Sequence, residues 1–179
     1  MSGINEGMVK IFFAPPGGDE NWHTKVESMW ATPINEPSAP GGRVFRLENT
    51  PWYAFGVSWQ DLICAELRHE TIGDDTPSRP KLEVDILYFT RVWKHSGRST
   101  YLAFLSEGIT AESPKWLERW EALKKMGCSW EGMNVKLIAI DVPPTANLDN
   151  VENILEEAEA ENVFSYQTQH RFTAPTSLG

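Results

Sequence analysis

Cysteine is scarce in this 179-residue sequence, and long apolar runs are absent. The two cysteines, Cys64 and Cys128, form no Cys-x-x-Cys motif, which excludes a disulfide-rich scaffold and a local zinc-ligand pattern. No apolar stretch approaches the ~20 residues of a membrane span, and the first residues show no cationic region followed by an apolar run. We therefore expect a soluble, cytoplasmic protein with two reduced thiols, while pairing of the two cysteines stays open.

Basic residues are also few. The chain has 16 lysines and arginines against 25 aspartates and glutamates, which gives a net charge of −9. This balance disfavours nucleic acid and anionic membranes as partners and leaves basic protein surfaces open. A chain of this length buries roughly 70% of its unfolded surface, so its core requires neither a metal nor disulfides.

Short strand patterns between proline- and glycine-rich loops dominate residues 1–98. Residues 14–21 and 35–42 combine proline with glycine and are predicted loops. Strand character occurs in Val9–Phe13, Val26–Thr32 and Arg43–Glu48. Short strands at this spacing are typical of a small barrel, so residues 1–98 are predicted to form a β-rich, barrel-like part.

Residues 58–70 fit two patterns. A helix would begin behind the capping pattern Ser58-x-x-Asp61, whereas Ile63 and Leu67 belong to an alternating pattern typical of a strand. We favour the strand.

The segments Leu82–Trp93 and Ser99–Leu105 form the clearest hairpin pattern of the sequence. Both are rich in apolar and β-branched residues, and the short polar stretch Lys94–Arg98 joins them. We therefore predict that they pair, with residues 94–98 at the hairpin tip.

Two helices are predicted in residues 99–179. The first begins at Ser113-Pro114, since serine favours the N-cap and proline the first helical position. The second runs from Leu148 to about Asn162 on apolar spacings of three and four. The apolar face of the first helix is predicted to consist of Trp116, Leu117, Trp120 and Leu123.

The strands around these helices complete a recognisable order. They are predicted at Tyr101–Leu105, Cys128–Glu131, Val135–Val142 and Phe164–Phe172. The order strand, helix, strand, strand, helix, strand is that of the split βαβ pattern. We therefore predict an α+β fold in which a ferredoxin-like part, residues 99–179, shares one core with the N-terminal barrel-like part.

Three short motifs resemble a known family. Val26–Pro33 contains a tryptophan strand, Leu47–Asp61 an asparagine-proline turn followed by Gly-Val, and Ser96–Thr100 the run Ser-Gly-Arg-Ser-Thr. Together they resemble the bacterial domain-of-unknown-function family 4265, over about Val9–Phe172. The resemblance implies no established activity; it implies a small bacterial cytoplasmic protein of the interaction-partner or immunity type.

One residue departs from the family pattern. Gln60 stands where the family has a glycine before the aspartate. Because glycine adopts positive φ angles readily and glutamine does not, the geometry of this turn stays open.

The predicted hairpin tip carries the densest group of reactive side chains. His95 would act as a general base beside Ser96 or Ser99, and Arg98 would bind an anion. Adjacent histidine and serine rarely acquire the geometry of a nucleophile and its base, so we favour a solvated turn around Gly97.

Local signals for metals and nucleotides are missing. His23, His69, His95 and His170 stand in four separate segments without ligand spacing, and no glycine-rich phosphate loop is present. We expect no metal and no cofactor, while a site assembled in three dimensions stays open. The C-terminal strands also lack the aromatic and basic signature of an RNA-recognition module.

Aromatic residues are frequent, with eight tryptophans. Most are expected in the core. Trp22, Trp52 and Tyr53, which flank predicted loops or turns, are candidates for an exposed anchor that contacts a partner.

The second predicted helix is strongly acidic. Between residues 149 and 161 it contains no lysine or arginine, and its last turn carries acids where the helix dipole disfavours them. The acids are Asp149, Glu152, Glu156, Glu157, Glu159 and Glu161. Such a conflict between local electrostatics and structure is more frequent at functional sites.

These observations favour a non-catalytic protein of the immunity or antitoxin type that occludes a basic partner surface. The predicted partner-binding residues are Asp149, Glu152, Glu156, Glu157, Glu159, His95, Arg98, Trp52 and Tyr53. The alternative is a small-molecule-binding protein or a small hydrolase whose cleft near the hairpin is lined by Asp61, His95 and Arg98.

Overall fold

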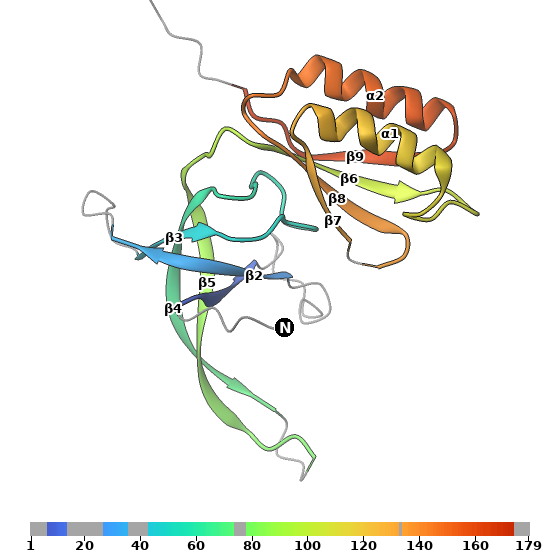
Figure 1. Ribbon diagram of the computed structural model, residues 1–179. Helices are drawn as coiled ribbons and strands as arrows, with labels where there is room; N and C mark the ends of the chain where they lie inside the picture. Colours follow the sequence, from blue (N-terminus) through green and yellow to red (C-terminus); the bar gives the residue numbers. More distant parts are fainter. Residues whose placement is uncertain (1–6, 14–26, 36–42, 74–77, 133, 174–179) are drawn as a thin grey trace, which may run out of the picture. The chain divides into compact units, whose positions relative to one another are not determined.

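The computed structural model shows an α+β protein, which confirms the predicted class (Figure 1). It describes residues 7–13, 27–35, 43–73, 78–132 and 134–173. The chain divides into two compact units. The first unit comprises Met1–Asn49 and Leu62–Lys94, and the second comprises Thr50–Asp61 and His95–Gly179. The segment Thr50–Asp61 thus groups with the C-terminal residues, although it precedes two strands of the first unit.

Five strands of the first unit form one sheet. They are β1 (Val9–Phe13), β2 (Glu27–Ile34), β3 (Arg43–Leu47), β4 (Leu62–Ile72) and β5 (Leu82–Lys94). Neighbours in this order are antiparallel, and β1 also pairs in parallel with β5 through Ile11 and Phe12. The predicted strands at the positions of β1, β2 and β3 are confirmed. The predicted loop at residues 14–21, together with Val26 and Trp22, lies outside the described residues.

Strands β4 and β5 form the longest ladder of the first unit. The strand favoured for residues 58–70 is confirmed from Leu62 onward. The ladder runs from Leu62 opposite Lys94 to Ile72 opposite Leu82, whereas β3 pairs with β4 only up to Ala65. Beyond that point the two strands extend as a ribbon, visible in Figure 1, whose exposed apolar side chains include Leu67 and Leu82.

The second unit contains the predicted order of strands and helices. Its elements are β6 (Ser99–Leu105), α1 (Pro114–Lys125), β7 (Ser129–Gly132), β8 (Leu137–Val142), α2 (Leu148–Ala160) and β9 (Phe164–His170). The sheet order is β7-β8-β6-β9, and every pair of neighbours is antiparallel. Figure 1 shows both helices on one face of this sheet.

The predicted hairpin between residues 82–93 and 99–105 is wrong. Strand β5 pairs with β4 and β1, and β6 pairs with β8 and β9. Both edges of each strand are therefore occupied by other partners, and β6 is a central strand of its sheet. Residues 95–98 connect the two sheets, with Gly97 at a φ of 87°.

Local signals set the helix ends. Ser113 stands at the N-cap of α1 and Pro114 follows it, and Gly127 occupies the C′ position after the helix with a φ of 85°, which favours glycine. Asn147 caps α2, and its side chain accepts a hydrogen bond from the Asn150 amide at 3.0 Å.

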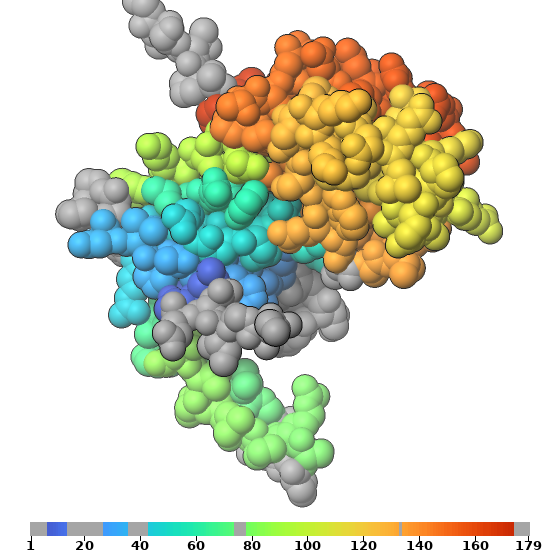
Figure 2. Space-filling view, in the orientation of Figure 1, coloured from blue at the N-terminus to red at the C-terminus, as the bar shows by residue number. Residues whose placement is uncertain are grey.

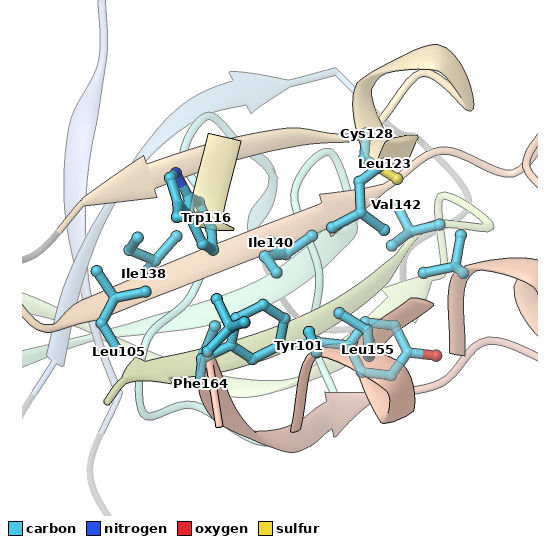
Figure 3. Close-up of a cluster of buried hydrophobic side chains, with 14 residues drawn as sticks. Tyr101, Leu105, Trp116, Leu123, Cys128, Ile138, Ile140, Val142, Leu155 and Phe164 are labelled. Atoms are coloured by element: carbon cyan, nitrogen blue, oxygen red, sulfur yellow. The ribbon is translucent and has the colours of Figure 1, made fainter. Parts of the chain in front are cut away.

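The core of the second unit lies between the helices and the sheet (Figure 3). Trp116 and Leu123 of α1 and Leu155 of α2 pack on Tyr101 and Ile140 of the sheet. Leu117, predicted on the same face of α1, is instead 43% exposed. Its position one residue after Trp116 turns it about 100° away from the buried stripe.

The opposite face of this sheet carries a smaller apolar cluster. Leu102, Leu137 and Ala139 are buried there, and Trp52 of the segment Thr50–Asp61 packs against them. The Ser58 hydroxyl also forms a 2.8 Å hydrogen bond with the Thr100 hydroxyl of β6. The second face of the sheet is thus covered in part by residues that precede β4 in the chain.

Both cysteines are buried free thiols. Among the described residues, neither α1 nor α2 has the length and the hydropathy of a membrane-crossing helix.

Candidate functional site

A tight turn at residues 58–61 begins the candidate site. The Asp61 amide donates to the Ser58 carbonyl at 3.1 Å, and the Ser58 amide donates to Asp61 Oδ2 at 3.0 Å. The capping pattern Ser58-x-x-Asp61 therefore closes a turn before β4 and starts no helix. Gln60 adopts a φ of 65° in this turn, so the position has the left-handed conformation although it is not a glycine.

Asp61 is fully buried and joins this turn to the connection that follows β5. His95 Nδ1 donates to Asp61 Oδ2 at 3.0 Å, and the Ser96 amide donates to Asp61 Oδ1 at 2.7 Å. The Ser96 hydroxyl lies 2.8 Å from Asp61 Oδ1 and 2.9 Å from the Trp59 carbonyl. A buried carboxylate requires such partners, because an unpaired buried charge costs several kcal/mol.

His170, the last residue of β9, stacks on His95. The ring centroids lie 4.7 Å apart with an interplanar angle of 16°. Among the described residues, the buried Nε2 of His170 has no hydrogen-bond partner. Burial, followed by the proximity of His95, lowers the pKa of His170 and so favours the neutral ring.

Asp61, His95 and His170 together have the donor groups of a metal site. One ligand atom from each residue lies within 4.8 Å of the other two. The sequence pattern did not identify this group, because its members stand in three separate segments. A search for local spacing such as His-x-x-x-His finds ligands on one helix and misses ligands that tertiary structure assembles.

Arg98 points into an internal ion pair. Its Nε donates to Asp141 Oδ1 at 2.7 Å, a second nitrogen contacts Asp141 Oδ2, and the guanidinium lies 4.7 Å from the centre of the Trp59 ring. Asp141 is fully buried and also accepts a hydrogen bond from the Ser129 hydroxyl at 3.1 Å. The predicted anion-binding arginine is thus occupied by a carboxylate of its own chain.

The serines of the connection are engaged as well. The Ser96 hydroxyl serves Asp61 or the Trp59 carbonyl, and the Ser99 hydroxyl accepts a hydrogen bond from the Phe172 amide at 3.0 Å. His95 directs Nδ1 to Asp61 and not to either serine. This arrangement is that of an oriented histidine without an adjacent serine nucleophile.

The Cys128 thiol is expected to be unreactive. Burial and the neighbouring Asp141 carboxylate raise its pKa to about 12. Since the thiolate is the reactive form, Cys128 is a structural residue at neutral pH.

The acids at the start of α2 have cationic partners that the sequence did not reveal. Arg171 Nε donates to Glu152 Oε1 at 2.7 Å, and a terminal nitrogen of Arg171 lies 3.3 Å from Asp149 Oδ1. The Tyr101 hydroxyl also donates to Glu152 Oε1 at 2.7 Å. The Arg171 hydrogen bond, more than that of Tyr101, lowers the pKa of Glu152 against the effect of its burial.

A second arginine neutralises the end of α2. Arg119 of α1 donates to Glu157 Oε2 at 2.9 Å and also contacts Glu161. These contacts explain why acids are tolerated in the last turn, where the helix dipole opposes them. The Glu156 side chain has neither a hydrogen bond nor an ion pair among the described residues, and the Glu159 carboxylate accepts only a 3.4 Å contact from the Tyr166 amide. Figure 2 shows both helices at the surface of the second unit.

The two aromatic anchor candidates differ in exposure. Trp52 is partly buried against Leu102, Leu137 and Ala139, so it contributes to a core cluster. Tyr53 is 51% exposed. The sequence places both beside a proline turn and does not distinguish them.

Comparison with known proteins gives a match to a family model and a solved structure of similar fold. The family model described as Domain of unknown function (DUF4265) matches residues 81–166, which confirms the resemblance over that span. The motif Ser96–Thr100 lies inside it, whereas Val26–Pro33 and Leu47–Asp61 lie outside. No curated protein matches the chain.

A solved structure described as "Novel crystal structure of a hypothetical protein from Neisseria gonorrhoeae" is similar to this chain. The TM-score is 0.63 at 17% sequence identity, and the match covers 92% of this chain and 96% of the other. At this identity the likeness shows a common fold.

Proposed function

We propose that this protein is a non-catalytic binding protein of the immunity or antitoxin type, which uses the exposed acids of α2 to occlude a basic partner surface. The observation that carries the proposal is the exposure of Glu156 and Glu159 without a cationic partner among the described residues. Asp149, Glu152 and Glu157 then serve mainly to hold α2 against Arg119 and Arg171.

The contacts of the reactive side chains support binding over hydrolysis. Arg98 pairs with Asp141, and the Ser96 hydroxyl is engaged with its own chain. A hydrolase that used these groups would have to break internal hydrogen bonds before each reaction, which costs about 1 to 3 kcal/mol for each buried group.

The test begins with a tagged protein purified from a bacterial host at low and moderate salt. A basic partner that binds through Glu156 and Glu159 should be retained at low salt and released at higher salt, since exposed charge pairs are screened. The double variant Glu156→Lys/Glu159→Lys should weaken binding of the purified partner at least ~10-fold.

The matched control is Glu107→Lys/Glu112→Lys. It changes the net charge by the same amount at exposed positions of the same unit, outside α2. Equal loss in both double variants would reduce the effect to overall charge and contradict a specific role of α2.

A second candidate is binding of a small polar ligand at His95. Asp61 holds His95 through Nδ1, which leaves Nε2 of the ring for a ligand. His95→Gln separates the two candidates: partner binding through α2 should persist, whereas a function centred on His95 should be lost.

We further infer the finer architecture and the setting of the protein. The order β7-β8-β6-β9 with antiparallel neighbours supports a ferredoxin-like second unit, and the additional β1–β5 pairing supports a barrel-like first unit. The buried free thiols and the resemblance to a bacterial family support a cytoplasmic bacterial protein.

A further inference from the structure

We propose that Asp61, His95 and His170 bind a divalent transition-metal ion of the zinc type through one carboxylate oxygen and one nitrogen of each imidazole. This inference goes beyond the proposed protein-binding role and does not depend on it. All three residues belong to the second unit.

The distances within the cluster suit a common ligand sphere. Asp61 Oδ2 and His95 Nδ1 lie 3.0 Å apart, and the donor atom of His170 lies within 4.8 Å of both. Two ligands of one zinc ion, each bound at about 2.0 to 2.1 Å, are separated by about 2.9 to 3.4 Å at angles of 90 to 109°. Only His170 has to approach to complete the set.

His170 also supplies an unexplained donor atom. Its Nε2 is buried and has no hydrogen-bond partner among the described residues. A buried polar atom without a partner costs about 1 to 3 kcal/mol, and a ligand bound to Nε2 would remove this cost. A neutral imidazole offers such a nitrogen lone pair to a metal.

The surroundings of Asp61 resemble those of a supported metal ligand. The amides of Ser58 and Ser96 donate to the two carboxylate oxygens and fix their direction. In the absence of metal, the Nδ1 proton of His95 lies against Asp61 Oδ2. For a metal to bind Nδ1, this proton would have to transfer to Nε2, so that the ring stays neutral and its Nδ1 lone pair faces the metal.

The donor set selects the class of ion. Two imidazoles and one carboxylate suit Zn²⁺, Co²⁺ or Ni²⁺, whereas Mg²⁺ and Ca²⁺ prefer oxygen ligands. Three protein ligands also leave a coordination position for water or for a group from a bound molecule.

The experiment titrates the full chain, purified free of metal, with Zn²⁺ in a calorimeter and with Co²⁺ in a visible spectrometer. We expect one high-affinity equivalent and Co²⁺ absorption bands typical of nitrogen and oxygen ligands. His95→Gln and His170→Gln should each weaken Zn²⁺ binding at least about 100-fold, beyond the 10- to 100-fold loss that outer partners of a ligand produce.

His69→Gln is the matched control. His69 contacts Asp85 in an exposed pair on β4 and β5, and no third ligand joins that pair among the described residues. Its variant should bind Zn²⁺ as the unaltered protein does. An equal loss in His69→Gln, or unchanged binding in both site variants, would overturn the proposal.

Nitrogen-detected NMR of the unaltered protein gives an answer that is independent of variant folding. One equivalent of Zn²⁺ should shift the ring nitrogens of His95 and His170 and leave those of His69 in place. Absence of these shifts at millimolar Zn²⁺ would equally overturn the site.

Discussion

Two histidine–aspartate pairs of this protein have the same chemistry and opposite surroundings. His69 and Asp85 face each other across the β4–β5 ribbon, and their side chains are 80% and 56% exposed. His95 and Asp61 meet in the second unit, where Asp61 is fully buried and His95 is 37% exposed. Solvent screens the first pair, so it contributes little to stability.

The buried pair differs because each of its residues makes further contacts. Asp61 accepts hydrogen bonds from the amides of Ser58 and Ser96, and His95 stacks on His170. The residue pair alone therefore defines no site. Burial and additional fixed partners turn an ordinary contact into a candidate site for a ligand.

Removing the buried carboxylate should have the largest effect. Asp61→Ala leaves the Ser58 and Ser96 amides without their acceptor, and we expect a loss of about 3 kcal/mol or more in the free energy of unfolding. Asp85→Ala should change it by less than about 0.5 kcal/mol. Urea denaturation at pH 7 measures both, and similar losses would break the contrast.

Removing the histidines should give a smaller difference in the free energy of unfolding, with the larger loss again at the buried pair. His95→Ala deletes a hydrogen bond to a buried charged group and should cost about 1.5 kcal/mol. His69→Ala should be neutral within about 0.5 kcal/mol. If the His95 variant were equally neutral in urea denaturation, Asp61 would have to be held by its amide donors alone.

The turn that positions Asp61 offers a stabilising change. Gln60 is exposed at a φ of 65°, so Gln60→Gly should relieve backbone strain and raise the free energy of unfolding by about 0.5 to 1 kcal/mol. Asn162, the other described residue with a positive φ that is not glycine, tolerates its φ of 56° better. Asn162→Gly should therefore gain less, and the thermal midpoints of the two variants should rank accordingly.

A pair of intermediate exposure should show the smallest effect. The pKa of Glu152 is lowered in the folded state, chiefly by the Arg171 hydrogen bond. The unfolded chain therefore binds more protons as the pH falls below about 4.5, and the contribution of Glu152 is present above this pH and lost below it.

Glu152→Gln removes this titration and keeps an acceptor for the Tyr101 hydroxyl. Between pH 6 and pH 3 the free energy of unfolding should fall less steeply in the variant than in the unaltered protein. The two decreases should differ by less than about 1 kcal/mol. A steeper fall in Glu152→Gln would contradict the assigned sign.

Much of the fold follows from local patterns. Ser113-Pro114 and Gly127 mark the ends of α1, and the apolar spacing from Leu148 marks α2. These signals are readable because capping and periodicity involve residues within a few positions of one another. The α+β class followed from the same patterns.

The pairing of β5 and β6 could not be obtained in this way. Only four residues separate these strands, yet each pairs with strands elsewhere in the chain. Strand pairing depends on which edges are already filled, and edge occupancy is a property of the assembled sheet.

The features of the candidate site likewise fall into those that follow from local sequence and those that require tertiary contacts. The helices, most strands and the acidity of α2 can be predicted from the sequence, since they depend on composition and short-range spacing. Tertiary structure alone decided that Arg98 meets Asp141, that Arg119 and Arg171 neutralise part of α2, and that His170 joins His95 and Asp61. The reason is physical: desolvation and contact geometry set the chemistry of a charged side chain, and both arise only when distant segments pack together.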